Sequence, residues 1–186
     1  MRIIGLLLLS CSLCMSCVQT DKKKALIDDD FLVAEQHLSN QLKAVPEPTV
    51  YPRTIGKDGK LIATPKNDWT EGFYPGCLWY IYEHNREESW KQSAVKWTEA
   101  LEPMKKLTSH HDIGFLIYCS FGNGYRLTGK EEYKDVIIEA ANSLTTRFSE
   151  VTGCIKSWNY RKAWNGRDEW FYPVIIDNMM NLELLY

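Results

Sequence analysis

The sequence lacks the charge bias and the motifs that mark several large classes of protein. Its 186 residues carry a formal net charge of −2, with no basic stretch that points to a charged membrane. Binding to nucleic acid would need a basic face or domain, so no nucleic-acid partner is expected. Phosphate-binding glycine loops, dinucleotide fingerprints, GxSxG and HExxH motifs are also missing, which excludes the enzymes that depend on them.

Cysteine spacing indicates neither a disulfide framework nor a zinc site. Six cysteines are present, and three of them lie in the first 17 residues. The others, Cys77, Cys119 and Cys154, are odd in number and have no CxxC spacing. Cys77 and Cys119 fall in apolar helical runs, where we expect small core residues. Three consecutive residues, His110-His111-Asp112, cannot all face one ion, so we expect no metal and no cofactor.

The N-terminus has the pattern of an export signal. Arg2 precedes an apolar run over residues 3–9 that is too short to span a bilayer, which takes about 20 residues. Ser16 directly before Cys17 resembles a bacterial lipobox, with Cys17 as the lipidated residue and Cys11 as the second choice. An ordinary cleaved signal with incidental cysteines is the alternative.

This N-terminal pattern predicts three segments. Residues 1–17 are expected to be a lipoprotein-type signal peptide, residues 18–27 a polar tether, and residues 28–186 the folded domain. We therefore expect a protein of the periplasm or outer membrane, which meets the membrane only through an N-terminal lipid anchor.

Helical periodicity dominates after residue 28 and predicts an all-α domain. The expected helices cover residues 28–42, 72–83, 87–107, 113–127, 131–148 and 174–186. Prolines at 46, 48 and 52 end the first helix and give an extended linker, and residues 56–60 predict a tight turn. Residues 149–172 form a long aromatic loop.

The central helices repeat in pairs. Gly72 begins the apolar run of the first unit, and Gly114 begins that of the second, 42 residues later. Glu87 and Glu131, in the polar turns that follow, are 44 residues apart. An apolar helix is buried and an amphipathic helix covers it, so this alternation predicts an α/α toroid or an α-solenoid. A third unit begins at Val174.

The most unusual residue groups stand at the N-terminal ends of the apolar helices, within residues 67–76, 109–115 and 171–182. Loops at these ends line the central cavity of a toroid, so we expect the chemistry there. Asp177 lies in an apolar stretch that raises the pKa of a carboxyl, as a general acid requires. The alternative is a carboxylate that caps its helix, which lowers the pKa.

Asp112 has the same two interpretations, and its equivalent place in the repeat favours a functional role. His111 is expected to donate a hydrogen bond to a substrate or to tune Asp112; the alternative is a surface or capping histidine. Trp69 and Trp158 lie in or before loops at the cavity end. Exposed indole rings there would stack on the apolar face of a sugar, and packing is their other interpretation.

Three segments taken together, Asp68–Phe73, His111–Phe115 and Ile176–Asn181, resemble the unsaturated glucuronyl hydrolases of glycoside hydrolase family 88. The resemblance implies an (α/α)6 toroid, of which this chain holds only about the first half. It implies a glycosidase that removes 4,5-unsaturated uronic acid from the non-reducing end of lyase-generated glycosaminoglycan oligosaccharides. The implied mechanism is hydration of a vinyl ether, to which the spacing rule for retaining and inverting glycosidases does not apply.

By this resemblance Asp177 is the general acid/base and Asp112 the second essential aspartate. His111, Trp69 and Trp158 match substrate-contacting positions, although the loop between Trp158 and Asp177 is a few residues longer than the family pattern. The implied ring has six helix pairs and this chain about three. We therefore expect a partial sequence or a truncated product, and we expect activity only of the full-length protein.

Two other functions stay open. An unsaturated rhamnogalacturonyl hydrolase would share the toroid and the chemistry but act on pectin fragments. A non-catalytic glycan-binding lipoprotein would use the same aromatic side chains without turnover. The expected partner of either enzyme is an unsaturated oligosaccharide, and the oligomeric state is not predicted.

Overall fold

The computed structural model describes the backbone of residues 2–186 and the side chains of residues 22–186. By its contacts the chain divides into two units, Met1–Asn40 and Gln41–Tyr186. Helix α1 spans Arg2–Ala44, so the helix expected to begin at residue 28 continues from further upstream. The predicted signal peptide, including Cys17 as its predicted lipidation site, lies outside the described side chains. No helix in the described part of the chain is long and apolar enough to cross a membrane.

The second unit is mostly helical, as predicted, but it also contains short strands. Its helices are α2 (Phe73–Asn85), α3 (Glu88–Glu99), η1 (Glu102–Lys106), α4 (Ile113–Ile117), η2 (Tyr118–Gly122), α5 (Asn123–Thr128), α6 (Glu131–Thr145), α7 (Asn178–Asn181) and η3 (Leu182–Leu185). Its strands are β1 (Tyr51–Ile55), β2 (Leu61–Thr64), β3 (Phe148–Ser149), β4 (Cys154–Ile155), β5 (Arg161–Lys162) and β6 (Glu169–Trp170). Among the described residues these strands pair into three antiparallel hairpins, which corrects the all-α prediction for the linker and the aromatic loop.

The predicted turn over residues 56–60 joins β1 to β2. The Gly56 N–H donates to the Lys60 carbonyl at 2.8 Å, and Gly59 has φ 77°, a conformation that favours glycine. Tyr51, at the start of β1, is fully buried, and its hydroxyl donates to the Trp97 carbonyl of α3 at 3.0 Å. The hairpin is therefore attached to the helices and is not a free linker.

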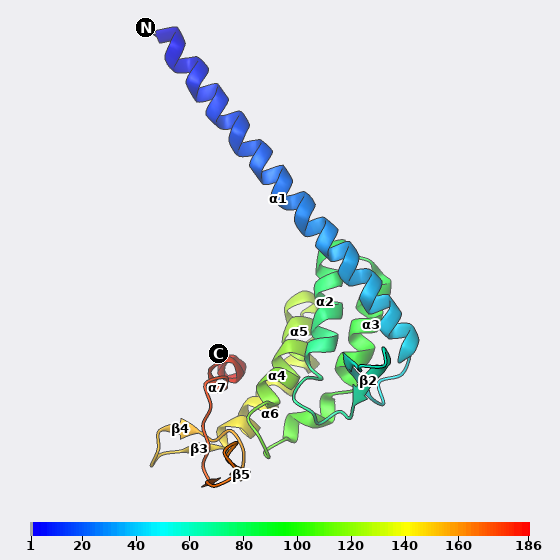
Figure 1. Cartoon of the computed structure of the whole chain (residues 1–186), viewed down its shortest axis with the longest axis vertical. Helices are drawn as coiled ribbons and strands as arrows, with labels where there is room; N and C mark the ends of the chain where they lie inside the picture. Colours follow the sequence, from blue (N-terminus) through cyan, green and yellow to red (C-terminus); the bar gives the residue numbers. More distant parts are fainter. Residues whose placement is uncertain (1) are drawn as a thin grey trace. The chain divides into compact units, whose positions relative to one another are not determined.

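The two predicted helix pairs are confirmed. Helix α2 packs on α3, and the run α4–η2–α5 packs on α6 (Figure 1). The inner helices of both pairs end alike, because Arg86 and Gly129 both adopt left-handed backbone conformations, with φ 60° and 66°. Their N–H groups donate to the carbonyls of Tyr82 and Tyr125, each at 2.8 Å. The sequence repeat is thus a repeat of backbone geometry.

Several helices differ from the prediction. The helix predicted over residues 87–107 ends at Glu99 and is followed by the 3-10 turn η1, and the one predicted over residues 131–148 ends at Thr145. The apolar run predicted over residues 113–127 contains the π-helical turn η2. The last helix begins at Asn178 instead of Val174. The Ile175 N–H donates to the Ser157 hydroxyl oxygen at 3.0 Å, so the backbone before α7 is held to another loop.

The prediction that Cys77 and Cys119 are core residues is wrong. Cys77 is exposed and Cys119 is partly exposed. Phe73 and Tyr80, on the same side of α2 as Cys77 by their spacing of three to four residues, are exposed as well. Helix α2 buries its other face, which includes the fully buried Trp79. An apolar run indicates that a helix can be buried. It does not indicate which face of the helix is covered by other elements.

Successive inner helices approach one another so closely that only glycine fits. A Cβ atom on Gly72, just before α2, would overlap the carbonyl oxygens of Phe115 and Leu116 in α4. A Cβ atom on Gly114 of α4 would overlap the backbone of Asn181 in α7. The beginning of α2 therefore lies against α4, and the beginning of α4 lies against Asn181 at the end of α7, which gathers the candidate residue groups.

We expect Gly72→Ala to lower the free energy of unfolding by about 3 kcal/mol, the upper range for overpacking a tight contact. The backbone at Gly72 has φ −65°, which alanine adopts without strain, so the loss would come from overlap with α4. Denaturant unfolding measures it. Gly59→Ala is the matched control, because Gly59 has a positive φ but no neighbour within 4 Å and should cost only about 1 kcal/mol. Equal losses at the two sites would argue against a tight contact between α2 and α4.

Candidate active site

Ser157 holds the segments before α4 and α7 side by side. The His111 N–H donates to the Ser157 carbonyl at 3.0 Å, and the Ser157 N–H donates to the Pro173 carbonyl at 2.8 Å. The Ser157 hydroxyl accepts the N–H of Ile175. Ser157 is fully buried, so these bonds do not compete with water. Main-chain contacts thus bring the two aspartate-bearing segments together.

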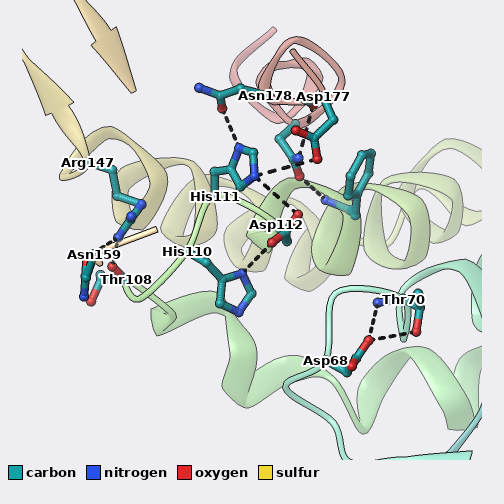
Figure 2. A network of polar contacts seen from close by, with 12 residues as sticks. Asp68, Thr70, Thr108, His110, His111, Asp112, Arg147, Asn159, Asp177 and Asn178 are labelled. Atoms are coloured by element: carbon teal, nitrogen blue, oxygen red, sulfur yellow. Dashed lines mark hydrogen bonds and ion pairs between the residues drawn. The ribbon is translucent and has the colours of Figure 1, made fainter. Parts of the chain in front are cut away.

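His111, Asp112 and Asp177 converge at this point (Figure 2). The Nε2 atom of His111 lies 3.5 Å from Oδ1 of Asp112 and 3.8 Å from Oδ2 of Asp177. These distances are too long for hydrogen bonds, so the contacts are electrostatic. His111 and Asp112 are buried, whereas the side chain of Asp177 is 38% exposed. Asp177 is therefore the member of this group that a ligand reaches most easily.

Neither aspartate caps its helix. Asp112 directly precedes α4 and Asp177 directly precedes α7, yet neither makes a side-chain hydrogen bond to the free amides of the helix. Both carboxylates lie beside His111 instead (Figure 2). The capping interpretation of the sequence is therefore not what the structure shows. His111 is likewise neither a surface residue nor a cap.

The surroundings of Asp177 raise the pKa of its carboxyl. Burial is the largest cause, because it disfavours the charged form. His111 opposes this effect and lowers the pKa, while the charge of Asp112 raises it further. The Oδ1 atom of Asp177 is buried and has no hydrogen-bond partner among the described side chains. The neutral carboxylic acid thus persists to higher pH than in an ordinary aspartate.

Asn178 sets the orientation of His111. Its Nδ2 atom donates to the Ile155 carbonyl at 2.7 Å, which leaves Oδ1 as an acceptor 3.0 Å from Nδ1 of His111. Nδ1 must then carry hydrogen, and Nε2 faces the two carboxylates. Sequence reasoning assigned no role to Asn178. The signal that could have identified Asn178 is an amide side chain directly after Asp177 in an otherwise apolar stretch.

Sequence reasoning also assigned no role to Arg147, which holds together the loops that position the site. Its Nε atom donates to the Lys156 carbonyl at 2.7 Å, and its Nη1 atom donates to the Thr108 carbonyl and to Oδ1 of Asn159 (Figure 2). The guanidinium is buried, and burial lowers its pKa, while the nearby Asp112 charge raises it. Arg147 therefore joins the loop before His111 to the loop around Ser157.

The histidine and the two carboxylates could also hold a metal ion. One ligand atom each from His111, Asp112 and Asp177 lies within 4.8 Å of the others. Three ligands with an open position is the pattern of catalytic zinc sites. His110, considered as a ligand from the sequence, instead places Nδ1 at 3.1 Å from Oδ2 of Asp112. The same nitrogen and carboxylate oxygens could instead share a proton. The expectation that no metal is bound therefore stays a prediction.

The two candidate tryptophans lie at different distances from this group. Trp158 packs its ring edge-on to His111, with centroids 5.6 Å apart and an interplanar angle of 75°. Trp69 is 44% exposed and contacts Phe115 of α4, with centroids 6.3 Å apart. Trp158 is therefore part of the site, whereas Trp69 packs on α4.

The aromatic loop after Trp158 borders a pocket of about 580 Å³. Its lining includes Trp164, Trp170 and Tyr172. Trp164 is 73% exposed, and its ring lies 5.7 Å from that of Trp170. The loop thus presents aromatic surface around a pocket whose lining includes neither His111 nor the two aspartates.

The similarity of the chain to known proteins is to one kind of enzyme. No family model matches it. An unsaturated glucuronyl hydrolase of Formosa agariphila is 44% identical over 138 residues, which are 73% of this chain and 33% of that protein. The crystal structure of an unsaturated glucuronyl hydrolase specific for heparin matches with a TM-score of 0.76 and 37% identity, over 84% of this chain and 40% of that one.

A third relative was crystallised with a ligand. It is a variant of the unsaturated glucuronyl hydrolase of Streptococcus agalactiae in complex with dGlcA-GalNAc6S. It is 27% identical, with a TM-score of 0.58, over 65% of this chain and 32% of that one. The chain spans about a third of the length of the curated relatives it matches.

We expect Asn178→Ala to release His111 from its fixed tautomer. The substitution removes the acceptor of the Nδ1 hydrogen and leaves the Ile155 carbonyl unpaired, at a cost of about 1–3 kcal/mol in stability. Nitrogen NMR of the imidazole ring should show the Nδ1–H form in the original protein and a mixture in the variant. Asn142→Ala, which truncates an exposed amide of α6, is the control. An unchanged tautomer in Asn178→Ala would mean that another group orients His111.

Proposed function

Because the chain belongs to the unsaturated glucuronyl hydrolases of glycoside hydrolase family 88, we propose that it supplies the acid–base site of such an enzyme. The reaction would remove a 4,5-unsaturated uronic acid from the non-reducing end of lyase-generated glycosaminoglycan oligosaccharides. The observation that carries the proposal is the partly exposed Asp177, whose pKa is raised, next to the buried pair His111 and Asp112. We further infer that the helix pairs form part of an (α/α)6 toroid.

The first step is protonation of the sugar double bond. Asp177 in its neutral form gives its proton to C4, and the positive charge that develops is shared between C5 and the ring oxygen. A raised pKa keeps the protonated form of this carboxyl populated to higher pH than in an ordinary aspartate. Asp112, as a buried carboxylate, stabilises the developing positive charge and orients the ring.

The second step is addition of water. Water attacks C5 and loses a proton to the carboxylate of Asp177, which restores the acid. The product is a hemiketal at C5, whose bond to the ring oxygen breaks to leave a ketone at C5 and a hemiacetal at C1. Breakdown of the hemiacetal releases the remaining sugar and an aldehyde, so one water is consumed and no other reactant is needed.

His111 acts on this cycle through its Nε2 atom. It faces both carboxylates, at 3.5 Å from Asp112 and 3.8 Å from Asp177, so its position links the two acidic groups. Asn178 keeps that atom directed at the carboxylates. Trp158, next to His111, offers an indole face for the sugar, and Trp69 extends the aromatic surface toward α2.

We expect Asp177→Asn to reduce turnover by about 10²- to 10⁴-fold, the usual contribution of a general acid, and to leave sugar binding largely intact. Turnover is followed by loss of the ultraviolet absorbance of the conjugated uronate, and binding by calorimetry. The variant should fold at least as stably at neutral pH. A raised carboxyl pKa means that the ionised group destabilises the fold above the unfolded-state pKa, and asparagine removes that charge.

Asp135→Asn, at an exposed position on α6, is the matched control and should keep the original rate. A normal rate in Asp177→Asn would assign Asp177 a structural role. Binding without turnover in the original protein would favour a non-catalytic glycan-binding protein. Loss of turnover on addition of a chelator would indicate that the side chains of His111, Asp112 and Asp177 hold a metal ion.

The pH dependence follows from the same carboxyl. Turnover should fall as pH rises through the pKa of Asp177, because only the protonated form donates a proton. That fall should lie above pH ~3.9, the ordinary aspartate value. Asp112→Asn removes a charge that raises this pKa, so the fall in its residual activity should move to lower pH. Profiles of kcat/KM against pH measure the fall in the original protein and in the variant. A fall at the same pH in Asp112→Asn would contradict the effect of the Asp112 charge on the pKa of Asp177.

A further inference from the structure

Arg161 lies against two tryptophan rings, whereas Arg53 and Arg86 each lie over one aromatic ring. The guanidinium carbon of Arg161 lies 4.5 Å from the ring centroid of Trp158 and 5.4 Å from that of Trp164. Its neighbour across the β5–β6 hairpin is Trp170, whose ring packs on Trp164. Stacking on aromatic faces restricts a guanidinium while leaving its N–H edge free to bind.

No acidic side chain neutralises this charge. Arg53 pairs with Asp68 and Arg126 with Glu83, but within residues 22–186 no carboxylate lies at ion-pair distance from Arg161. The arginine is only partly exposed, so its charge is not fully hydrated. A partly desolvated guanidinium without a carboxylate partner favours an oxyanion ligand.

Arg161 is also close to the proposed catalytic group. Trp158 contacts Arg161 through its face and His111 edge-on, so one side chain separates the cation from the site. The charge of Asp112, which also raises the pKa of Asp177, would repel an anionic substrate. Arg147, although nearby, is buried and donates to backbone carbonyls, so it cannot offset that repulsion by pairing with the substrate.

We propose that Arg161 binds an oxyanion of the substrate and so selects charged over neutral oligosaccharides. This inference rests on the proposed function. The two oxygens can belong to the uronate carboxylate or to a sulfate on the adjoining sugar, since both match the guanidinium fork. Arg161 is thus a specificity-determining residue and takes no part in the proton transfers.

Three substrates separate these sources: an unsulfated unsaturated disaccharide, its sulfated counterpart and the methyl ester of the unsulfated one. Arg161→Gln should raise KM by about 10- to 100-fold, the scale of a charge-assisted hydrogen bond, and change kcat little. If the carboxylate is bound, the two acids lose affinity and the ester does not. If the sulfate is bound, only the sulfated substrate loses affinity.

Arg161→Lys keeps the charge but loses the fork, so it should fall between the original protein and Arg161→Gln. Arg167→Gln, an exposed arginine in the same hairpin, should leave all three KM values unchanged. Equal effects of Arg161→Gln on all three substrates would overturn the proposal.

The same substitution is also made in the Asp177→Asn background, where calorimetry measures binding of the sulfated and unsulfated disaccharides without turnover. If the original protein turns over none of the substrates, the proposed function fails, and these titrations still decide the role of Arg161. Affinity that is independent of Arg161 in this background, or no binding at all, would likewise overturn the inference.

Discussion

The site depends on the hydrogen bonds at Ser157. Its carbonyl, N–H and hydroxyl bind three backbone groups, of His111, Pro173 and Ile175, that belong to segments far apart in the sequence. Because two of these bonds are between backbone groups, the relative position of the segments does not depend on which side chains they carry. Asp112 and Asp177 therefore meet through a main-chain constraint, and the carboxylates inherit their separation from it.

The glycine contacts and the electrostatics of the site have a common effect. With no side chain at Gly114, α7 lies directly on α4 at Asn181, and the two carboxylates share one small volume beside an imidazole. Two negative charges in such a volume cost free energy unless one is neutralised by a proton. Asp177, the more exposed of the two, has the raised pKa. Close packing of the backbone thus contributes to the raised pKa of the Asp177 carboxyl.

The sequence predicted what depends on local pattern and missed what depends on distant contacts. The helix pairs follow from periodicity and turn composition, and the repeat places Asp112 and Asp177 at equivalent helix starts, so their proximity was predictable. The roles of Asn178 and Arg147 depend on carbonyls in other segments, which no spacing rule reveals. The exposure of Cys77 was missed because an apolar run does not specify its covered face.

The aromatic hairpin that carries Arg161 leaves the fold at Ser157 and returns at Pro173, and the 2.8 Å bond between these residues closes it at the base. A loop closed in this way can change length cheaply, since doubling it costs only about 0.6 kcal/mol of closure entropy. Insertions between these two positions would leave Asp177 where it is. Natural variation or engineering can therefore change the length and sequence of this hairpin. Such changes would alter which sugars bind and leave the position of Asp177 unchanged.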